Sequence, residues 1–159
     1  MIVVGVDGSP GSDAALRWAL AEAKLRAVPV RAVNAYESPP LLADGIAMGA
    51  PSVLASAASS EDVQRLRSVS EAKARRVLDE ALARADAQRN GVEVEAEAVE
   101  GSPAETLIRA GRDAELLIVG SRGRGGFAGL LLGSVSQQCT HHAPCPVVIL
   151  PPAEEDEDG

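Results

Sequence analysis

The residues of this sequence that are best suited to chemistry lie in a glycine-rich segment at positions 120–135. Glycine has no Cβ atom, so its backbone N–H can approach an anion closely, and it adopts the positive φ angles that a phosphate cradle requires. Gly133 and Ser134 begin a predicted helix, whose free N–H groups and dipole favour phosphate. Arg122 and Arg124 add positive charge. The segment is typical of an anion site, and the anion that it favours is a triphosphate.

Known phosphate motifs narrow the interpretation of these glycines. The sequence contains no Gly-Lys-Ser or Gly-Lys-Thr, which excludes a P-loop. Residues 123–128 match Gly-x-Gly-x-x-Ala by letter, but no acidic residue follows about twenty positions later to hold a ribose. A dinucleotide site is therefore not favoured. The remaining alternative is a surface loop whose arginines are simply solvated.

A second glycine-bearing loop, Gly5-Val6-Asp7-Gly8-Ser9-Pro10-Gly11-Ser12, follows the first apolar run of the chain. In an open parallel α/β sheet, ligands bind beyond the carboxyl ends of the strands, at the point where the strand order reverses. If both loops leave strands at that edge, they border one cleft. We therefore expect residues 5–12 and 120–135 to form a single site.

Five short runs rich in β-branched residues predict the strands that position these loops. Four runs are nearly continuous apolar stretches, as expected of strands covered on both faces in a parallel sheet. The third run alternates apolar and acidic residues, which places it at an edge of the sheet. The predicted strands are residues 2–6, 30–33, 92–99, 116–119 and 147–150.

Helical patterns separate these strands. The expected helices cover residues 12–26, about 61–89, a segment that starts at Ser102, and 134–142 before Pro144. The alternation predicts an α/β fold: a doubly wound, five-stranded parallel sheet with helices on both faces and right-handed crossovers. The strand order that we expect for this Rossmann-like sheet is 3-2-1-4-5.

Details of these helices can be tested against the structure. Glu22 and Arg26 are spaced for an i,i+4 ion pair. Ser102 and Glu105, which flank Pro103, predict a capping box at the start of the third helix. The second helix has an apolar stripe that should face the core. The stripe consists of Val63, Leu66, Val77, Leu78, Ala81, Leu82 and Ala85.

Composition and charge exclude several classes of protein. The chain has 159 residues, enough for one domain with a single core, and 46% of them are hydrophobic. The net charge is −8, five acids lie together at 154–158, and no basic arm is present, so nucleic acid is not expected as the main ligand. The first apolar run stops at Asp7 without a basic flank, so we expect neither a signal peptide nor a membrane span.

The two cysteines, Cys139 and Cys145, are too few for a secreted disulfide scaffold, and a cytoplasmic location is expected. They lie near two histidines, but no Cys-x-x-Cys pair is present, so a structural role is favoured over zinc. We expect one domain over residues 1–151, an acidic disordered tail over 152–159, and a functional or mobile loop over 37–60.

The spacing Gly120-x2-Gly123-x9-Gly133-Ser134 resembles the ATP-binding signature of the universal stress protein family. Three other segments support the resemblance, and together they extend it over about residues 1–150. They are Val3-Val4-Gly5-Val6-Asp7-Gly8-Ser9, Gly101-Ser102-Pro103 and Cys145-Pro146-Val147-Val148. One departure is Glu115, which stands where the family usually has Asp before the fourth strand.

The resemblance implies a site for ATP, with Mg²⁺, built from both loops. It implies that Asp7 faces the nucleotide, that Val33 at the end of the second strand offers backbone groups to adenine, and that Ser134 binds phosphate. The alternatives are an ordinary turn aspartate, simple core packing and a helix cap, respectively. The implied nucleotide-binding residues are Gly5, Val6, Asp7, Val33, Gly120, Ser121, Arg122, Gly123, Arg124, Gly125, Gly126, Gly133, Ser134 and Val135.

Three functions follow from these patterns and this resemblance. The first is an ATP-binding regulator of the stress response, in which nucleotide occupancy sets conformation, dimer state or affinity for an unidentified protein partner. The resemblance implies a homodimer that pairs through the last strand, Val147–Leu150. The second is a slow ATPase, for which Asp7 is the only carboxylate near the expected phosphates. The third is an interaction module that works without nucleotide.

Overall fold

The computed structural model describes residues 1–37, 60–124 and 131–152. Its centre is a five-stranded sheet of order β3-β2-β1-β4-β5 in which all neighbouring strands run parallel. The predicted fold class and strand order are confirmed. The strands are β1 (Ile2–Gly5), β2 (Val30–Tyr36), β3 (Val94–Glu100), β4 (Leu116–Gly120) and β5 (Val147–Leu150).

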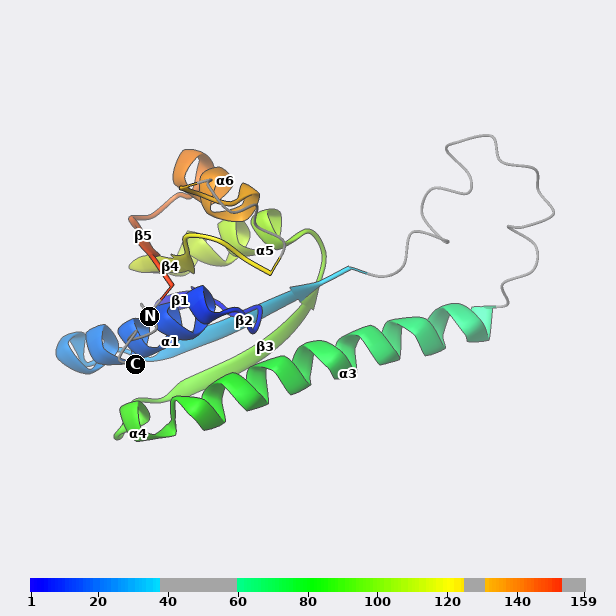
Figure 1. Ribbon diagram of the computed structural model, residues 1–159, viewed down its shortest axis with the longest axis horizontal. Helices are drawn as coiled ribbons and strands as arrows, with labels where there is room; N and C mark the ends of the chain where they lie inside the picture. Colours follow the sequence, from blue (N-terminus) through cyan, green and yellow to red (C-terminus); the bar gives the residue numbers. More distant parts are fainter. Residues whose placement is uncertain (38–59, 125–130, 153–159) are drawn as a thin grey trace, which may run out of the picture.

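Helices cover both faces of this sheet (Figure 1). One face is packed against α1 (Pro10–Arg26) and α3 (Ser60–Arg84), after which comes the short α4 (Asp86–Arg89). The other face is packed against α5 (Pro103–Ala110), with the short 3₁₀ turn Gly111–Asp113 after it, and against α6 (Ser134–His142). The last helix begins and ends as the sequence predicts.

The central strands are apolar throughout because both of their faces are covered. Ile2, Val3 and Val4 of β1 are each 0% exposed. Successive side chains of a strand point to opposite faces, so Ile2 and Val4 pack toward α1 and α3, and Val3 packs toward α5 and α6. Full burial of a side chain of this size contributes about 1.5–3 kcal/mol to stability. β1 is therefore a rigid base for the loop that follows it.

The outer strand β3 is an edge strand, as predicted. The side chains of Glu95 and Glu97 point outward, and the guanidinium Nε of Arg31 on β2 lies 3.1 Å and 3.9 Å from their carboxylate oxygens. Charged side chains along an exposed edge disfavour pairing with another strand. The other edge, β5, carries only apolar side chains, all of them half-buried.

The second predicted helix is wrong in two respects. It breaks at Ala85, where the backbone leaves helical geometry at φ −98° and ψ 8°. The stripe is buried only toward its end, at Leu78, Ala81 and Ala85, whereas Leu66 is 38% exposed. The reason is visible in Figure 1: the first half of α3 extends past the end of the sheet.

Helix starts also differ from prediction. α1 begins at Pro10, not at Ser12, because the Ser9 hydroxyl caps it by accepting the Ser12 N–H and proline fits the first helical position. At α5 the predicted capping box does not form. Ser102 occupies the cap position and its carbonyl accepts the first helical bond, from the Thr106 N–H, but its side chain makes no capping bond. The Glu22–Arg26 pair is confirmed, at 2.6 Å.

The cysteines pack in the apolar layer between the sheet and helices α5 and α6. Burial raises the pKa of the Cys139 thiol to about 11, and burial also raises the pKa of Cys145. Within the three described segments, no group of three or more histidine, cysteine or acidic side chains is placed to hold a metal ion. A search of the same segments finds no helix with the length and hydropathy needed to span a bilayer.

Candidate functional site

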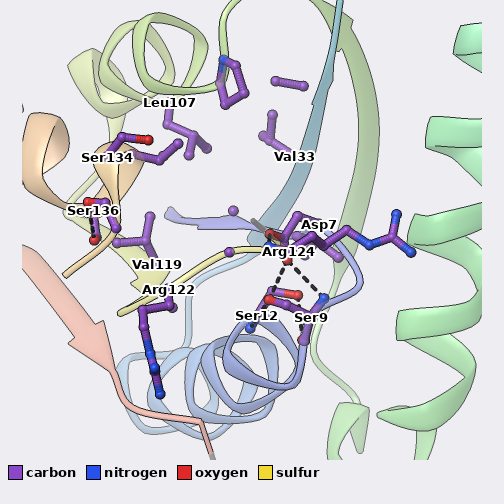
Figure 2. A pocket seen from close by; sticks show the side chains of 18 residues that line it. Asp7, Ser9, Ser12, Val33, Leu107, Val119, Arg122, Arg124, Ser134 and Ser136 are labelled. Carbon is purple, nitrogen blue, oxygen red and sulfur yellow. Dashed lines mark hydrogen bonds between the residues drawn. The ribbon is translucent and has the colours of Figure 1, made fainter. Parts of the chain in front are cut away.

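A pocket of about 420 Å³ opens between the carboxyl ends of β1 and β4 (Figure 2). The chain leaves β1 toward β2 on one side and leaves β4 toward β5 on the other, so this is the point where the strand order reverses. The lining residues come from both glycine loops, from β2 and from the starts of α5 and α6. They are Gly5, Val6, Asp7, Ser9, Ser12, Val33, Ala35, Pro103, Leu107, Val119, Gly120, Arg122, Gly123, Arg124, Gly133, Ser134, Val135 and Ser136.

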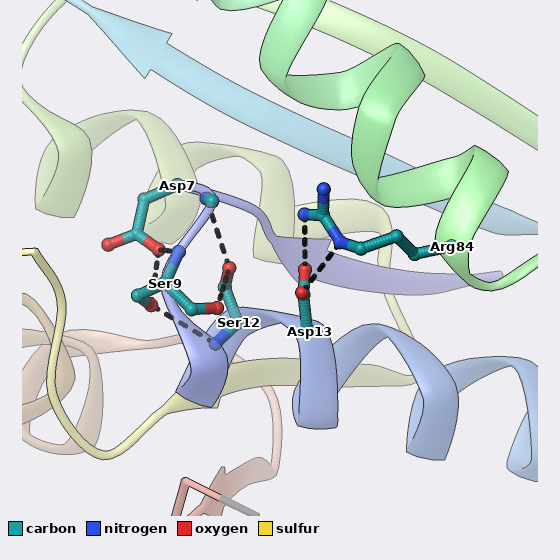
Figure 3. A network of polar contacts seen from close by, with 6 residues as sticks. Asp7, Ser9, Ser12, Asp13 and Arg84 are labelled. Carbon is teal, nitrogen blue, oxygen red and sulfur yellow. Dashed lines mark hydrogen bonds and ion pairs between the residues drawn. The ribbon is translucent and has the colours of Figure 1, made fainter.

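Asp7 connects the two loops. Its Oδ1 accepts hydrogen bonds from the Ser9 N–H at 2.9 Å and from the Ser9 hydroxyl at 2.5 Å, which is an aspartate turn (Figure 3). Its Oδ2 accepts the Arg124 N–H from the second loop at 3.2 Å. A Cβ on Gly123 would lie 2.7 Å from that Oδ2. Asp7 is therefore a turn aspartate and also a pocket residue, and Gly123 lacks a side chain where the carboxylate needs the space.

The N-terminus of α1 uses its donors within the protein. The Ser12 N–H donates to the Ser9 hydroxyl and the Gly8 N–H donates to the Ser12 hydroxyl, both at 3.2 Å. Pro10 has no N–H, and the Asp13 N–H bonds to the Ser9 carbonyl at 3.0 Å. Figure 3 also shows the Asp13 carboxylate held by two 2.9 Å hydrogen bonds from Arg84 on α3. This end of the pocket is closed and rigid, and it has few donors left for a ligand.

The N-terminus of α6 is open by contrast. Gly133, which has no side chain, occupies its N-cap position, and the first intrahelical bond runs from the Gln137 N–H to the Gly133 carbonyl. The N–H groups of Ser134, Val135 and Ser136 precede that bond, so they have no acceptor within the helix. Because Ser134 is the first helical residue, its hydroxyl is not a cap. The alternative role of Ser134 as a helix cap is therefore not seen: a serine caps α1, whereas no serine caps α6.

A buried scaffold holds this open terminus in place. The Ser121 carbonyl accepts the Gly133 N–H at 2.7 Å and the Ser136 hydroxyl at 2.8 Å. The Ser121 N–H in turn donates to the Leu150 carbonyl at the end of β5. Ser121 is thus 8% exposed and does not line the pocket. It lies behind the site and connects β4, β5 and α6, and its implied contact with nucleotide stays a prediction.

The two arginines lie at the pocket mouth, and their side chains diverge (Figure 2). Arg124 extends toward α3, with its guanidinium carbon 3.8 Å from the place where a Cβ on Gly8 would be. Arg122 points downward in the same view, away from Arg124. Both residues line the cavity. They are the only positively charged residues among the described lining residues, and most of the others are small or apolar.

The apolar end of the pocket corrects the expectation for Val33. β2 does not end at Val33 but continues to Tyr36, whose carbonyl accepts the Gly101 N–H at 2.9 Å. The Val33 carbonyl already accepts the Val6 N–H at 2.9 Å. In a parallel ladder, alternate residues present their backbone groups to the same neighbour. Ala35 therefore faces the β1 side as Val33 does, but at a level where β1 has ended.

Gly120 has a packing role in addition to its place in the pocket. A Cβ at this position would lie 2.7 Å from the backbone carbon of Gly11 and 3.0 Å from its oxygen. Gly11 is constrained less tightly, because a Cβ there would lie 3.1 Å from the Arg122 carbonyl oxygen. The two glycines let the start of α1 pack directly against the end of β4. The short distance between the two loops depends on this contact.

The structure thus brings the two predicted loops together. Every implied residue that it describes, except Ser121, lines the pocket. Gly125 and Gly126, the tail and most of the predicted loop 37–60 lie outside the described residues. Seven lining residues were not among the implied nucleotide-binding residues: Ser9, Ser12, Ala35, Pro103, Leu107, Val119 and Ser136. Ser9 and Ser12 belong to the first glycine loop and Ser136 directly follows Val135, so these serines could have been included, whereas the apolar residues carry no signal that separates them from core.

Comparisons with known proteins point to one family. The sequence model described as the universal stress protein family matches residues 1–151. The universal stress protein Rv2623 of Mycobacterium tuberculosis is 34% identical over 161 residues, which cover 99% of this chain and 48% of that protein. The chain thus spans about half the length of the curated relatives that it matches.

Solved structures show the same fold. The universal stress protein UspA from Lactobacillus plantarum is 19% identical, with a TM-score of 0.71, over 94% of this chain and 95% of its own. A universal stress protein in complex with cAMP is 26% identical, with a TM-score of 0.61, over 94% of each chain.

Proposed function

The chain belongs to the universal stress protein family, and on that premise we propose that it binds an adenine nucleotide, ATP, in this pocket and acts as a regulator of the stress response. The observation that carries the proposal is the N-terminus of α6, whose first N–H groups have no acceptor among the described residues, at a pocket lined mostly by small and apolar residues. A related protein, 26% identical, has been solved with cAMP. The pocket and the related structure thus both support a ligand that contains adenine and phosphate.

The nucleotide would lie across the pocket with its phosphates at α6. The N–H groups of Ser134 and Val135 and the Ser134 hydroxyl would bind phosphate, and Arg122 and Arg124 would supply positive charge at the mouth. Gly123 would let the chain pass close to the ribose and phosphates. Gly125 and Gly126 are proposed to contact the same phosphate chain, as the resemblance implies.

The base would lie at the apolar end, between Leu107 on α5 and the end of β2. There the Ala35 N–H and carbonyl face the space beyond β1. One donor beside one acceptor matches the edge of adenine, whose ring nitrogen accepts and whose amino group donates. Guanine presents the opposite pattern and would leave polar groups unpaired. We therefore assign to Ala35 the backbone role that the sequence assigned to Val33.

The family pattern implies Mg²⁺ with ATP. Among the described residues that line the pocket, Asp7 is the only carboxylate. Protein sites commonly hold Mg²⁺ through one or two carboxylates together with substrate phosphates, so the donor set fits. Asp7 would hold the ion, which neutralises phosphate charge when bound. Asp7→Asn should therefore weaken ATP binding in the presence of Mg²⁺ and leave binding in EDTA unchanged; equal effects in both conditions would contradict this role.

Rapid ATP hydrolysis is not part of the proposal. Hydrolysis requires a residue that positions water, and Asp7, the only carboxylate among the described lining residues, is the residue proposed to hold the metal ion. We expect at most slow cleavage. A turnover assay decides the point: several turnovers per second that vanish in Asp7→Asn would favour an ATPase.

Direct titration tests the proposal as a whole. Calorimetry with ATP should give saturable binding at one site per chain, with GTP much weaker because of the donor and acceptor order at Ala35. Absence of ATP binding, by heat or by competition, would favour the interaction module that works without nucleotide. Mass spectrometry of small molecules that co-purify with the protein gives a second, independent measurement.

The dimer is a separate part of the proposal. β5 is an outer strand with only apolar side chains, all half-buried, and pairing with a second copy would cover that edge. Light scattering should give twice the monomer mass, and Ile149→Glu should shift the protein to monomer. A monomeric wild-type protein would contradict the proposed dimer without bearing on the proposed nucleotide site.

A further inference from the structure

Asn34 on β2 makes a contact that ordinary strand pairing does not. Its side-chain amide Nδ2 donates a 2.7 Å hydrogen bond to the backbone carbonyl of Val6. The side chain lies on the same face of β2 as Ala32, and Asn34 is only 8% exposed. A carbonyl can only accept, so the amide nitrogen, and not the amide oxygen, must face Val6.

The sheet register shows what this bond replaces. Gly5 pairs with Val33, and the Val6 N–H donates to the Val33 carbonyl. The next bond of a parallel ladder would run from the Ala35 N–H to the Val6 carbonyl. Among the described residues that backbone bond is not formed, and the Asn34 amide occupies the carbonyl in its place.

We propose that Asn34 is a positioning residue that ends the β1–β2 ladder at Val6 and thereby keeps the Ala35 N–H available to the nucleotide base. We call the replacement of the Ala35–Val6 backbone bond by the Asn34 amide the ladder substitution; it follows from the structure alone, whereas its consequence for the base rests on the proposed function. The bond satisfies the last carbonyl of the ladder with a side chain, so no backbone donor is consumed. It also holds Val6 by both of its backbone groups, immediately before the Asp7 turn.

Removal of the amide has a defined consequence. The Val6 carbonyl would lose its donor in a mostly buried place, and an unsatisfied carbonyl there is costly. The nearest replacement by register is the Ala35 N–H, which would extend the ladder by one bond. That bond would consume the donor that adenine needs. Asn34 variants should therefore lose base recognition while phosphate recognition at α6 is retained.

The test uses Asn34→Leu, which nearly keeps the shape and removes the donor. The matched control is Thr106→Val, another buried polar side chain, 3% exposed, that does not line the pocket. Amide hydrogen exchange by NMR follows the Ala35 N–H in the ligand-free protein. Calorimetry measures ATP and, as a probe without a base, inorganic tripolyphosphate.

In the wild type the Ala35 amide should exchange rapidly when ligand-free and become protected by ATP. In Asn34→Leu it should be protected without ligand. ATP affinity should fall about tenfold, the equivalent of one hydrogen bond of about 1.4 kcal/mol, while tripolyphosphate affinity changes less than about twofold. Thr106→Val should change neither the exchange nor the ratio of the two affinities.

Three results would distinguish the possibilities. A wild-type Ala35 amide that is protected as strongly as that of Val33 overturns the inference without any variant, so it stays falsifiable even if Asn34→Leu does not fold. Equal losses for ATP and tripolyphosphate also overturn it, because they indicate a merely structural role. The expected change in Ala35 exchange, together with no ATP binding by the wild type, supports the ladder substitution and refutes the proposed function.

Discussion

Replacement of Ser134 by proline tests the phosphate site directly. Ser134 is the first residue of α6, a position that proline tolerates because its N–H has no intrahelical partner. Gly133 has φ −80° and ψ 172°, the extended conformation that a residue before proline requires. The variant therefore removes one N–H and one hydroxyl from the pocket and leaves the helix intact.

The expected loss follows from the bonds removed. A hydrogen bond to a charged group contributes about 1.5–3 kcal/mol, so loss of one N–H bond to phosphate should weaken ATP about ten- to 150-fold. Ser134→Ala removes only the hydroxyl and should cost less. Adenosine lacks phosphate, so its affinity should not change in either variant. The thermal unfolding midpoint should stay near that of the wild type.

Calorimetry at about physiological salt is the suitable assay, because screening weakens exposed charge interactions and leaves short hydrogen bonds less affected. Gln138→Ala, on the exposed side of the same helix, is the matched control and should bind ATP as the wild type does. A folded Ser134→Pro variant with wild-type affinity for ATP would refute the assignment of phosphate to α6. A parallel loss for adenosine would indicate a general distortion of the pocket.

Three further predictions concern stability. Gly120→Ala places a Cβ 2.7 Å from the backbone of Gly11 and should cost about 1–3 kcal/mol of unfolding free energy, measured in urea; an unchanged midpoint would contradict the close contact. Burial raises the pKa of the Cys139 thiol to about 11, so the folded state favours the neutral thiol. The contribution of this thiol to the free energy of unfolding should be fully present below pH 9 and should fall by roughly 2–3 kcal/mol as the pH rises toward 11. Cys139→Ala should remove that part of the decline in urea unfolding measured against pH. Arg84→Ala breaks a partly exposed pair with Asp13 and should cost at most about 1 kcal/mol in thermal unfolding, so a much larger loss would show that the pair is critical to the attachment of α3.

The fold could be read from the sequence because its signals are local. Continuous apolar runs mark strands covered on both faces, and the alternation in residues 92–99 marks an edge. Glycine spacing marks places where the backbone must turn or approach another group. These patterns depend on residue types within one segment, so they predicted the strands, the edge position of one of them and the two loops of the pocket.

The roles of single residues in the pocket depended on contacts between segments. Ser9 and Ser134 each stand at the start of a helix, yet only Ser9 caps one, and the difference lies in how the chain enters each helix. Val33 and Ala35 have equivalent orientation on β2, and what distinguishes them is that β1 ends between their two levels. The residues of one strand do not indicate where its neighbouring strand ends. The sequence by itself thus determined the architecture and the place of the site, while only the tertiary structure decided which backbone groups there are paired and which are free.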